Sequence, residues 1–174
     1  MLSRFLLITV MFVFLACQSE KNNHSEEGTQ KNNGTKAPEF VLQTLDGKDY
    51  DSGELKGRIL IVDFWATWCQ PCIQEMPDYN ALYKKFKSEK FEMLGVTLAS
   101  GDANAVKNFI GNLKIDYPIY MGNDKVVADF GGIMAFPTTF VIDQDWNIVK
   151  KYVGGGKVKI DEIEMIVEAL LEKS

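Results

Sequence analysis

Residues 59–72 read ILIVDFWATWCQPC and contain the sequence's most informative pattern. Residues 59–65 are β-branched, aliphatic or aromatic apart from Asp63, a pattern typical of a strand that is covered on both faces. Cys69 and Cys72 follow, and from Met76 onward apolar residues recur at helical spacing. The stretch therefore predicts a dithiol at a strand-to-helix turn.

The position of Cys69 predicts a reactive thiol. Unpaired backbone N–H groups and the positive end of the helix dipole favour thiolate over thiol at a helix N-terminus, so we expect Cys69 to be the exposed, attacking sulfur. Cys72, one turn later, would be the shielded, resolving sulfur. A structural disulfide and half of a zinc site are the alternatives. Zinc would need two further ligands, and Cys17 and His24 are the remaining soft candidates, in a tail of different composition. We expect no metal and no cofactor besides the Cys69–Cys72 disulfide.

Outward from this stretch, strand and helix patterns alternate. Strands are expected at 40–45, 48–50, 59–65, 91–98, 118–121, 139–142 and 147–153, and helices over 72–86, around 106–113, at 125–130 and around 160–170. Asp46-Gly47 separates the first two strands and is typical of a hairpin turn. We expect Trp65 to support the core. This order predicts an α/β fold with a mixed central sheet flanked by helices.

The first residues have the composition of an export signal. Arg4 is followed by the apolar run 5–16, which is too short to span a bilayer permanently and matches the n-region and h-region of a secretory signal. Ala16-Cys17 then resembles the lipobox of bacterial lipoproteins. Residues 1–17 are therefore interpreted as a lipoprotein signal peptide with Cys17 as the lipidation site; an ordinary signal peptide or an uncleaved anchor is the alternative.

The rest of the chain divides into a tether and one domain. Residues 18–36 hold almost nothing apolar, which predicts a flexible polar tether. Residues 37–174 are long enough for a single core. The net charge is −5 with acidic and basic residues interspersed, so we expect no nucleic-acid partner. The domain's two cysteines are those of the CxxC motif, which leaves them available for chemistry.

Two segments resemble known motifs. Residues 62–72, VDFWATWCQPC, resemble the active-site segment of thioredoxins, and residues 136–143, FPTTFVID, resemble their cis-proline segment. Three further features are similar to the membrane-tethered TlpA/ResA-like branch: an N-terminal hairpin ending at 54–57, an extra helix between the second and third core strands, and Glu75-Met76-Pro77 after the CxxC. The resemblance covers residues 37–174 and implies a thioredoxin fold with an N-terminal β-hairpin and an inserted helix.

The resemblance assigns roles to two acidic residues. Asp63 occupies the place of the proton acceptor for the buried cysteine in thioredoxins, and a buried carboxyl should have a raised pKa. Glu75 occupies the place of an acid beside the thiols in ResA-like proteins. The alternatives are an Asp63 that reaches solvent or a lysine, and a Glu75 that is an exposed helix residue. The sequence leaves open which of the two handles the proton.

The resemblance also predicts a substrate groove. Pro137 should be cis and should expose the backbone of Phe136 for strand-like pairing with a substrate peptide; a trans proline opening a strand is the alternative. Phe136 would form the rim of an apolar groove together with Trp68, Pro71 and Gly154.

The function implied is that of a thiol–disulfide oxidoreductase of the bacterial cell envelope. ResA-like proteins keep the cysteines of apocytochrome c reduced, so we expect disulfide-containing envelope proteins as substrates, a membrane dithiol as electron donor, and a lipid anchor facing the periplasm or extracytoplasmic space. Gln70-Pro71 lacks the His that strong oxidants of the superfamily carry, which favours a reductant or mild isomerase. The alternatives are a thiol peroxidase, which would need Thr or Ser where Ala66 stands, and a copper chaperone, for which Met134 is the candidate ligand.

Overall fold

The structure is a computed structural model that describes residues 35–173. The predicted signal peptide, the lipidation site Cys17 and residues 18–34 of the predicted tether lie outside the described residues. The described part contains the strands β1 (Thr35–Lys36), β2 (Val41–Thr44), β3 (Asp49–Asp51), β4 (Ile59–Trp65), β5 (Phe91–Thr97), β6 (Ile119–Met121), β7 (Thr138–Ile142) and β8 (Asn147–Val153). The helices are the 3₁₀ turn η1 (Ser52–Leu55), α1 (Gln70–Phe86), α2 (Ala103–Ile110), α3 (Asp124–Asp129) and α4 (Lys157–Leu171).

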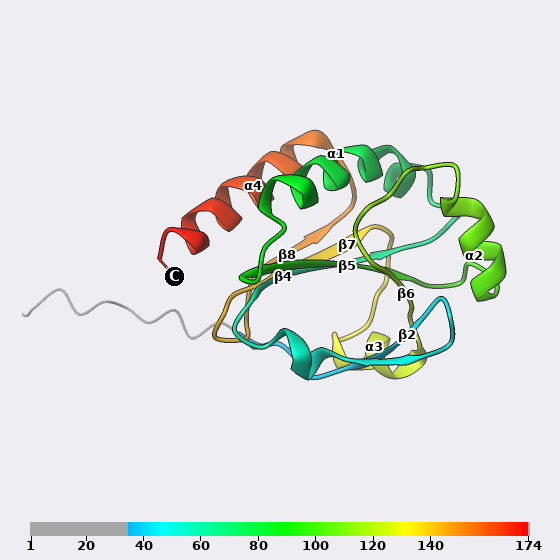
Figure 1. Cartoon of the computed structure of the whole chain (residues 1–174), viewed down its shortest axis with the longest axis horizontal. Coiled ribbons are helices and arrows are strands. Elements are labelled where there is room, and N and C mark those ends of the chain that lie inside the picture. Colours follow the sequence, from blue (N-terminus) through cyan, green and yellow to red (C-terminus); the bar gives the residue numbers. More distant parts are fainter. Residues whose placement is uncertain (1–34, 174) are drawn as a thin grey trace, which may run out of the picture. The chain divides into compact units, whose positions relative to one another are not determined.

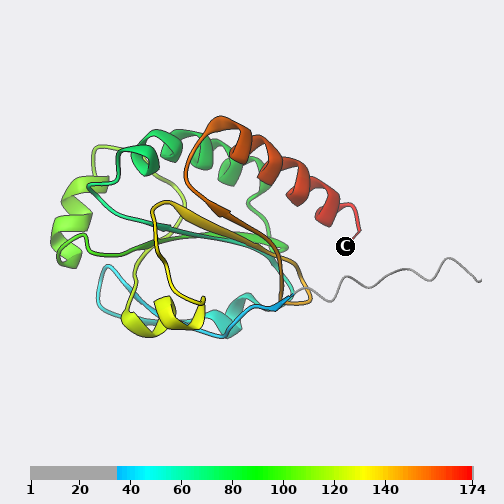
Figure 2. The ribbon, with the colours of Figure 1, turned by 180° about the vertical axis from the view of Figure 1, so that it is seen from behind.

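The strands form one mixed sheet with helices on both faces. Its order is β1-β8-β7-β4-β5-β6-β2-β3, so β4 lies in the middle, parallel to β5 and antiparallel to β7. Helices α1 and α4 cover one face, and α3 with η1 lies on the other (Figure 1). The view from behind shows the same layers (Figure 2). The predicted fold, an α/β mixed sheet with an N-terminal hairpin (β2–β3) and an inserted helix (α2), is confirmed.

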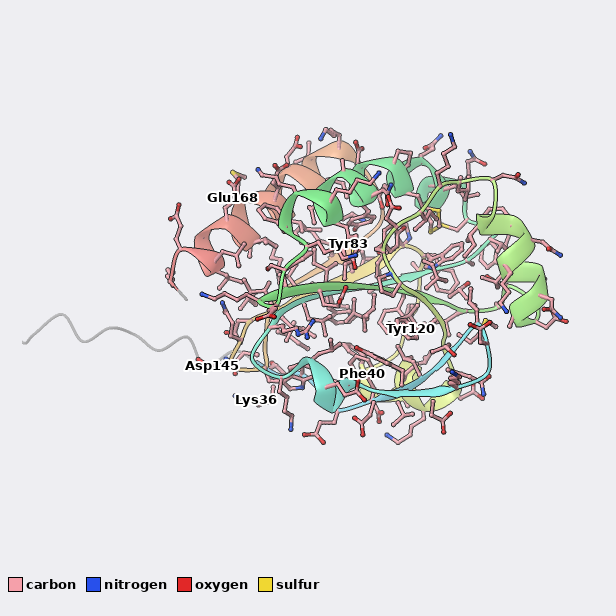
Figure 3. The ribbon with its side chains drawn as sticks, in the orientation of Figure 1. Lys36, Phe40, Tyr83, Tyr120, Asp145 and Glu168 are labelled. Atoms are coloured by element: carbon pink, nitrogen blue, oxygen red, sulfur yellow. A yellow bond between two sulfur atoms is a disulfide. The ribbon has the colours of Figure 1, made fainter. Side chains whose placement is uncertain are left out.

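The side chains of β4 alternate between two apolar clusters, one on each face of the sheet. Ile59, Ile61 and Trp65 enter the cluster beneath α1 and α4, and Leu60, Val62 and Phe64 enter the cluster on the α3 side. Figure 3 shows Tyr83 on the helical side and Phe40 and Tyr120 on the opposite side. Because successive side chains of a strand point to opposite faces, Asp63 shares the α1 face with Ile61 and Trp65.

Strand pairing brings distant segments to the end of β4 that leads into the dithiol. Phe64 pairs with Thr138, the first residue of β7, and Asp63 pairs with Thr139. Since β7 is antiparallel to β4, the loop that precedes β7 reaches the carboxyl end of β4. The segment around Pro137 is thereby placed at the strand-to-helix turn that carries the cysteines.

The described chain enters the domain at the opposite end of the sheet. β1 pairs with the start of β8, Lys36 Nζ donates to the carbonyl of Asp145 at 2.7 Å, and the N–H of Ala37 donates to the carbonyl of Trp146 at 2.9 Å. The turn between β7 and β8 follows Ile142, which pairs with Leu60 near the start of β4. The point of entry and the dithiol therefore lie at opposite ends of the central strands.

The predicted elements match the observed ones within three residues, and two of the differences have a physical reason. The sheet begins two residues before the predicted start of the domain at 37, because Thr35–Lys36 pairs with β8. The helix predicted to reach Leu113 ends at Ile110, where Gly111 follows and the chain turns. Glycine weakens a helix by about 1 kcal/mol relative to alanine, which favours this earlier end.

We predict that Phe64→Ala lowers the free energy of unfolding by about 3–5 kcal/mol, because the removed ring leaves a cavity in the cluster on the α3 side. Phe64 is fully buried and its ring centre lies 5.3 Å from that of Phe130. Guanidinium denaturation measures the change, with Val41→Ala at a 46% exposed position as the control. Equal unfolding midpoints for the two variants would contradict the burial of this ring.

Candidate active site

The two cysteines form a disulfide at the N-terminus of α1. Their Cα atoms lie 5.3 Å apart, Cys69 is the N-cap residue, and its sulfur accepts a hydrogen bond from the Cys72 N–H at 3.3 Å. In the reduced protein the same N–H would favour a thiolate on Cys69. The expected contrast in exposure is absent from this disulfide form, because Cys69 and Cys72 are 4% and 2% exposed. What distinguishes them here is the hydrogen bond.

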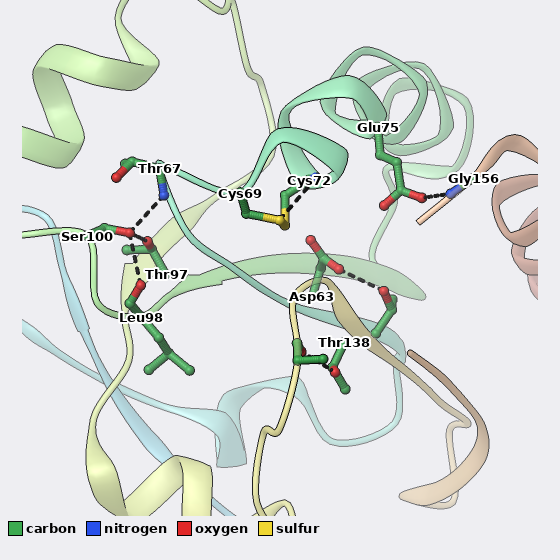
Figure 4. Close-up of a disulfide and its surroundings, with 12 residues drawn as sticks. Asp63, Thr67, Cys69, Cys72, Glu75, Thr97, Leu98, Ser100, Thr138 and Gly156 are labelled. Atoms are coloured by element: carbon green, nitrogen blue, oxygen red, sulfur yellow. Dashed lines mark hydrogen bonds between the residues drawn. A yellow bond between two sulfur atoms is a disulfide. The ribbon is translucent and has the colours of Figure 1, made fainter. Parts of the chain in front are cut away.

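The turn before the cysteines is held by the loop that follows β5. Ser100 Oγ accepts hydrogen bonds from the Thr67 N–H at 3.0 Å and from the Thr97 hydroxyl at 2.6 Å (Figure 4). The Trp68 indole N–H donates to the carbonyl of Ala99 at 2.9 Å, and Ala99 itself has a left-handed backbone with φ of 50°. These contacts fix the path of the chain into Cys69. Sequence analysis did not identify this loop, since none of its residues belongs to a motif.

Asp63 lies beneath the disulfide. It is 4% exposed, its carboxyl points toward the disulfide in Figure 4, and its Oδ1 accepts a hydrogen bond from the Thr139 hydroxyl at 2.7 Å. Burial raises the pKa of Asp63 to about 7, although the charge of Lys159 and the Thr139 hydrogen bond act in the opposite direction. The expected burial and raised pKa of Asp63 are confirmed, so a carboxyl that titrates near neutral pH lies behind the thiols.

Glu75 is also buried, on the face of α1 that Cys72 shares. It is 4% exposed and forms an ion pair with Lys159 from α4, with 2.7 Å between Oε2 and Nζ. The backbone N–H of Gly156 donates to its other oxygen (Figure 4). The alternative of an exposed helix residue is therefore wrong, and the structure brings both predicted acids to the buried side of the dithiol.

Three polar residues that connect the acids were missed by sequence analysis. Thr139 Oγ1 contacts Asp63, the Tyr79 hydroxyl at 3.0 Å and Lys159 Nζ at 3.2 Å. A signal for Lys159 was present, because it precedes the buried Ile163 by four residues and so falls on the inward face of the last helix. A lone lysine in an amphipathic pattern is usually read as exposed, which is why it was passed over.

Four of the predicted groove residues contact one another in pairs. The Phe136–Pro137 bond is cis, as predicted, and the Gly154 N–H donates to the Pro137 carbonyl at 2.8 Å. The rings of Trp68 and Phe136 meet edge to face, 5.6 Å between centres, and Pro71 is exposed. The structure therefore brings Trp68 to Phe136 and Gly154 to Pro137.

Large apolar side chains are exposed in these same segments. Trp68 is 65% exposed, Met134 in the loop before Pro137 is 95% exposed, and Val153, which pairs with Thr138, is 63% exposed. Exposed apolar groups in one region are typical of interaction surfaces.

Within residues 35–173, no cluster of three or more His, Cys, Asp or Glu side chains is arranged to hold a metal ion. A disulfide with a buried carboxyl group behind it can support thiol–disulfide exchange, and that carboxyl group can gain or lose a proton near neutral pH.

We predict that the free energy of unfolding of the oxidised protein falls as the pH rises from about 4 to about 7. The folded state holds the Asp63 proton up to about pH 7, whereas in the unfolded chain the same group ionises near 3.8, so ionisation favours the unfolded state throughout this window. The loss should be on the order of 4 kcal/mol. Denaturation against pH measures it, and Asp63→Asn should lack this fall. A wild-type profile parallel to that of Asp63→Asn would contradict the raised pKa.

Comparisons with known proteins agree with this site. Residues 32–170 match the model of the Redoxin family. The chain is 36% identical over 121 residues to the thiol-disulfide oxidoreductase ResA of Bacillus subtilis, covering 70% of this chain and 67% of the relative. It is 34% identical over 131 residues to the thioredoxin-like protein YneN of the same organism, covering 74% and 75%.

A solved structure has the same architecture. The thiol:disulfide interchange protein of Chlorobium tepidum TLS superposes with a TM-score of 0.70 at 36% identity, covering 79% of this chain and 97% of that one. The family match spans most of the described residues, and the ResA relative is named as a thiol-disulfide oxidoreductase. The chain therefore belongs to the Redoxin family, as a ResA-like member of the thioredoxin superfamily, and is a thiol–disulfide oxidoreductase.

Proposed function

We propose that this oxidoreductase works as a reductase of protein disulfides. The observation that carries the direction is the buried carboxyl group of Asp63 on the inner side of the dithiol. Strong oxidants stabilise the thiolate and hence their reduced form. Because Lys159 pairs with Glu75, the negative charge that remains behind the sulfurs is that of ionised Asp63, and it acts against a thiolate. No imidazole stands between the cysteines to favour one. Both features support a dithiol that readily gives up its electrons.

The proposed reaction uses Cys69 as the attacking group. The Cys69 thiolate attacks one sulfur of a substrate disulfide, the substrate S–S bond breaks, and the other substrate sulfur leaves as a thiolate that takes a proton. Cys72 then gives its proton to the Asp63 carboxylate and attacks the Cys69 sulfur, which breaks the mixed disulfide. The second substrate sulfur leaves as a thiolate and takes up a proton from the solvent, to which Asp63 gives up its own. The substrate gains two electrons and two protons, and the enzyme is left with the Cys69–Cys72 disulfide.

The proposed substrates are envelope proteins with an oxidised cysteine pair, such as a cytochrome c precursor before haem attachment. The exposed apolar groups at Trp68, Met134 and Val153 support a substrate that presents an unfolded or loop segment. Trp68, Pro71, Phe136, Pro137 and Gly154 would form the groove. Regeneration of the dithiol requires a second dithiol, which we place in a membrane protein that delivers electrons from the other side of the bilayer.

The proposed location is the outer face of the cytoplasmic membrane or the periplasm, with a lipid on Cys17. None of the helices within residues 35–173 has the length and apolar character needed to cross a bilayer. The described chain enters the domain at the end of the sheet opposite the dithiol. An anchor on the N-terminal side would thus leave the dithiol free to meet substrates.

We predict that the full-length chain in detergent reduces insulin disulfides with dithiothreitol as electron source, and that Cys69→Ser abolishes this activity because it removes the nucleophile. Insulin turbidity measures the rate. Cys17→Ala is the matched control, since it removes the third cysteine and should keep full activity. Cys72→Ser should instead accumulate a mixed disulfide with insulin through Cys69. Full activity of Cys69→Ser would contradict the assignment, and rapid peroxide consumption would support the peroxidase alternative.

We predict that radiolabelled palmitate enters the wild-type protein expressed in a bacterial host and does not enter Cys17→Ala. The reason is the Ala16-Cys17 junction after an apolar segment, where lipoprotein processing modifies the cysteine. Cys72→Ser serves as a control and should be labelled like the wild type. Equal labelling of Cys17→Ala and wild type would show that Cys17 is not the lipidation site.

A further inference from the structure

Lys159 is a buried cation beside the active site. It is 7% exposed and shares the inward face of α4 with Ile163 and Val167, which are fully buried. Lysine is among the residues least often buried, and it is found inside proteins when its charge is paired. The apolar packing of α4 on the sheet does not need a charge at this position. The partners of Lys159 must therefore explain why it is there.

Those partners link the two carboxyl groups of the site. Lys159 Nζ lies 2.7 Å from Glu75 Oε2 and 3.2 Å from Thr139 Oγ1. Thr139 Oγ1 lies 2.7 Å from Asp63 Oδ1 and 3.0 Å from the Tyr79 hydroxyl. A single ammonium group thus neutralises one acid directly and reaches the other through one hydroxyl.

Hydrogen-bond capacity allows only two arrangements around Thr139. Its hydroxyl has one proton to donate and two lone pairs to accept, and Lys159 can only donate to it. When Asp63 is ionised, Thr139 donates to Asp63 and accepts from Tyr79. When Asp63 is protonated, Asp63 donates to Thr139, and Thr139 donates to the Tyr79 oxygen. In both arrangements the Thr139 hydroxyl donates its proton to one neighbour and accepts from two, so Asp63 can gain or lose a proton without leaving Thr139 unpaired.

We propose that Lys159 is a positioning residue for proton transfer, which holds Thr139 and Glu75 in place and supplies the positive charge that lets Asp63 ionise behind Cys72. The proposal rests on the proposed role of Asp63 as proton acceptor for Cys72. It adds a residue to the reaction that neither the dithiol nor the cis-proline segment contains.

The Thr139 hydrogen bond lowers the pKa of Asp63, as the charge of Lys159 does. Burial and the charge of Glu75 both raise its pKa, and the charge of Lys159 is the largest influence that lowers it. Tyr79 and Tyr117 also lie close enough for the Asp63 charge to contribute to their raised pKa values, after burial. These tyrosines stay neutral near pH 7 and the thiols are absent from the oxidised form. Burial has the largest effect on the Asp63 pKa, and among the charged groups the balance is between Lys159 and Glu75.

The test is the titration of the Asp63 side-chain carboxyl, followed by carbon-detected NMR on the oxidised full-length chain in detergent. Lys159→Met should raise the Asp63 pKa by about one unit or more, because it removes the nearby positive charge. Glu75→Gln should lower it. In the double variant Lys159→Met/Glu75→Gln, the Asp63 pKa should lie between the values in wild type and in Lys159→Met. Removal of the Lys159 charge raises the pKa, and removal of the Glu75 charge, whose effect is smaller, lowers it in part.

Lys157→Met is the matched control, because Lys157 lies in the same turn of α4 but is exposed and pairs with Asp161. It should leave the titration unchanged. The double variant keeps the test valid if Lys159→Met alone fails to fold, since it leaves no unpaired buried charge. An Asp63 titration in the double variant that lies at or below that of wild type would overturn the proposal.

Insulin reduction against pH separates this inference from the proposed function. If the reductase function and the role of Lys159 are both correct, the double variant stops turning over at a higher pH than wild type does, in step with its higher Asp63 pKa. The lower pH limit of turnover by Lys157→Met should equal that of wild type. A shifted titration in an active enzyme whose pH profile does not move would overturn the role of Lys159 in proton transfer. Absence of insulin reduction by wild type, with the predicted order of titrations intact, would refute the reductase and leave the electrostatic role of Lys159 standing.

Discussion

A carboxyl group, that of Asp63, is buried in the central strand of the sheet behind a disulfide (Figure 4), and the elements around it are arranged to accommodate it. Asp63 interrupts an otherwise apolar strand, and alternation along β4 turns it toward α1 rather than toward α3. A buried carboxylate is costly unless it is hydrogen-bonded or paired. The surrounding elements provide for this, with Thr139 from the paired strand β7 and Lys159 from α4.

The buried carboxyl group connects packing to chemistry. Helix α1 presents Cys72, Glu75 and Tyr79 to the sheet on one face, so the helix that holds the dithiol also closes the polar network. Because the carboxyl pKa of Asp63 lies near 7, small changes in neighbouring charge alter its protonation in the physiological range. Loss or gain of a proton on the thiols is such a change. Reciprocally, the state of Asp63 affects how easily the thiols ionise.

The periodicity of apolar residues and short sequence motifs predicted most of the fold and the cysteines and acids of the site. The bounds of β4 and β8, the position of the cysteines and the burial of Asp63 follow from periodicity and from the resemblance to thioredoxins. Lys159 and Thr139 could not be predicted in the same way, since their roles come from contacts between β7, α4 and α1 that lie 20 to 84 residues apart in sequence. β1 was missed because two polar residues carry no strand pattern, and their pairing depends on the turn at Asp145.

The reduction potential of the Cys69–Cys72 couple, measured against pH, reports whether Asp63 is coupled to the dithiol. Two protons taken up with two electrons give a slope of about 60 mV per pH unit. If Asp63 changes its affinity for a proton when the disulfide is reduced, the wild-type plot departs from this slope around pH 7, and the plot for Asp63→Asn does not. Superimposable straight lines for the two proteins across this range would show that the buried carboxyl does not sense the thiols.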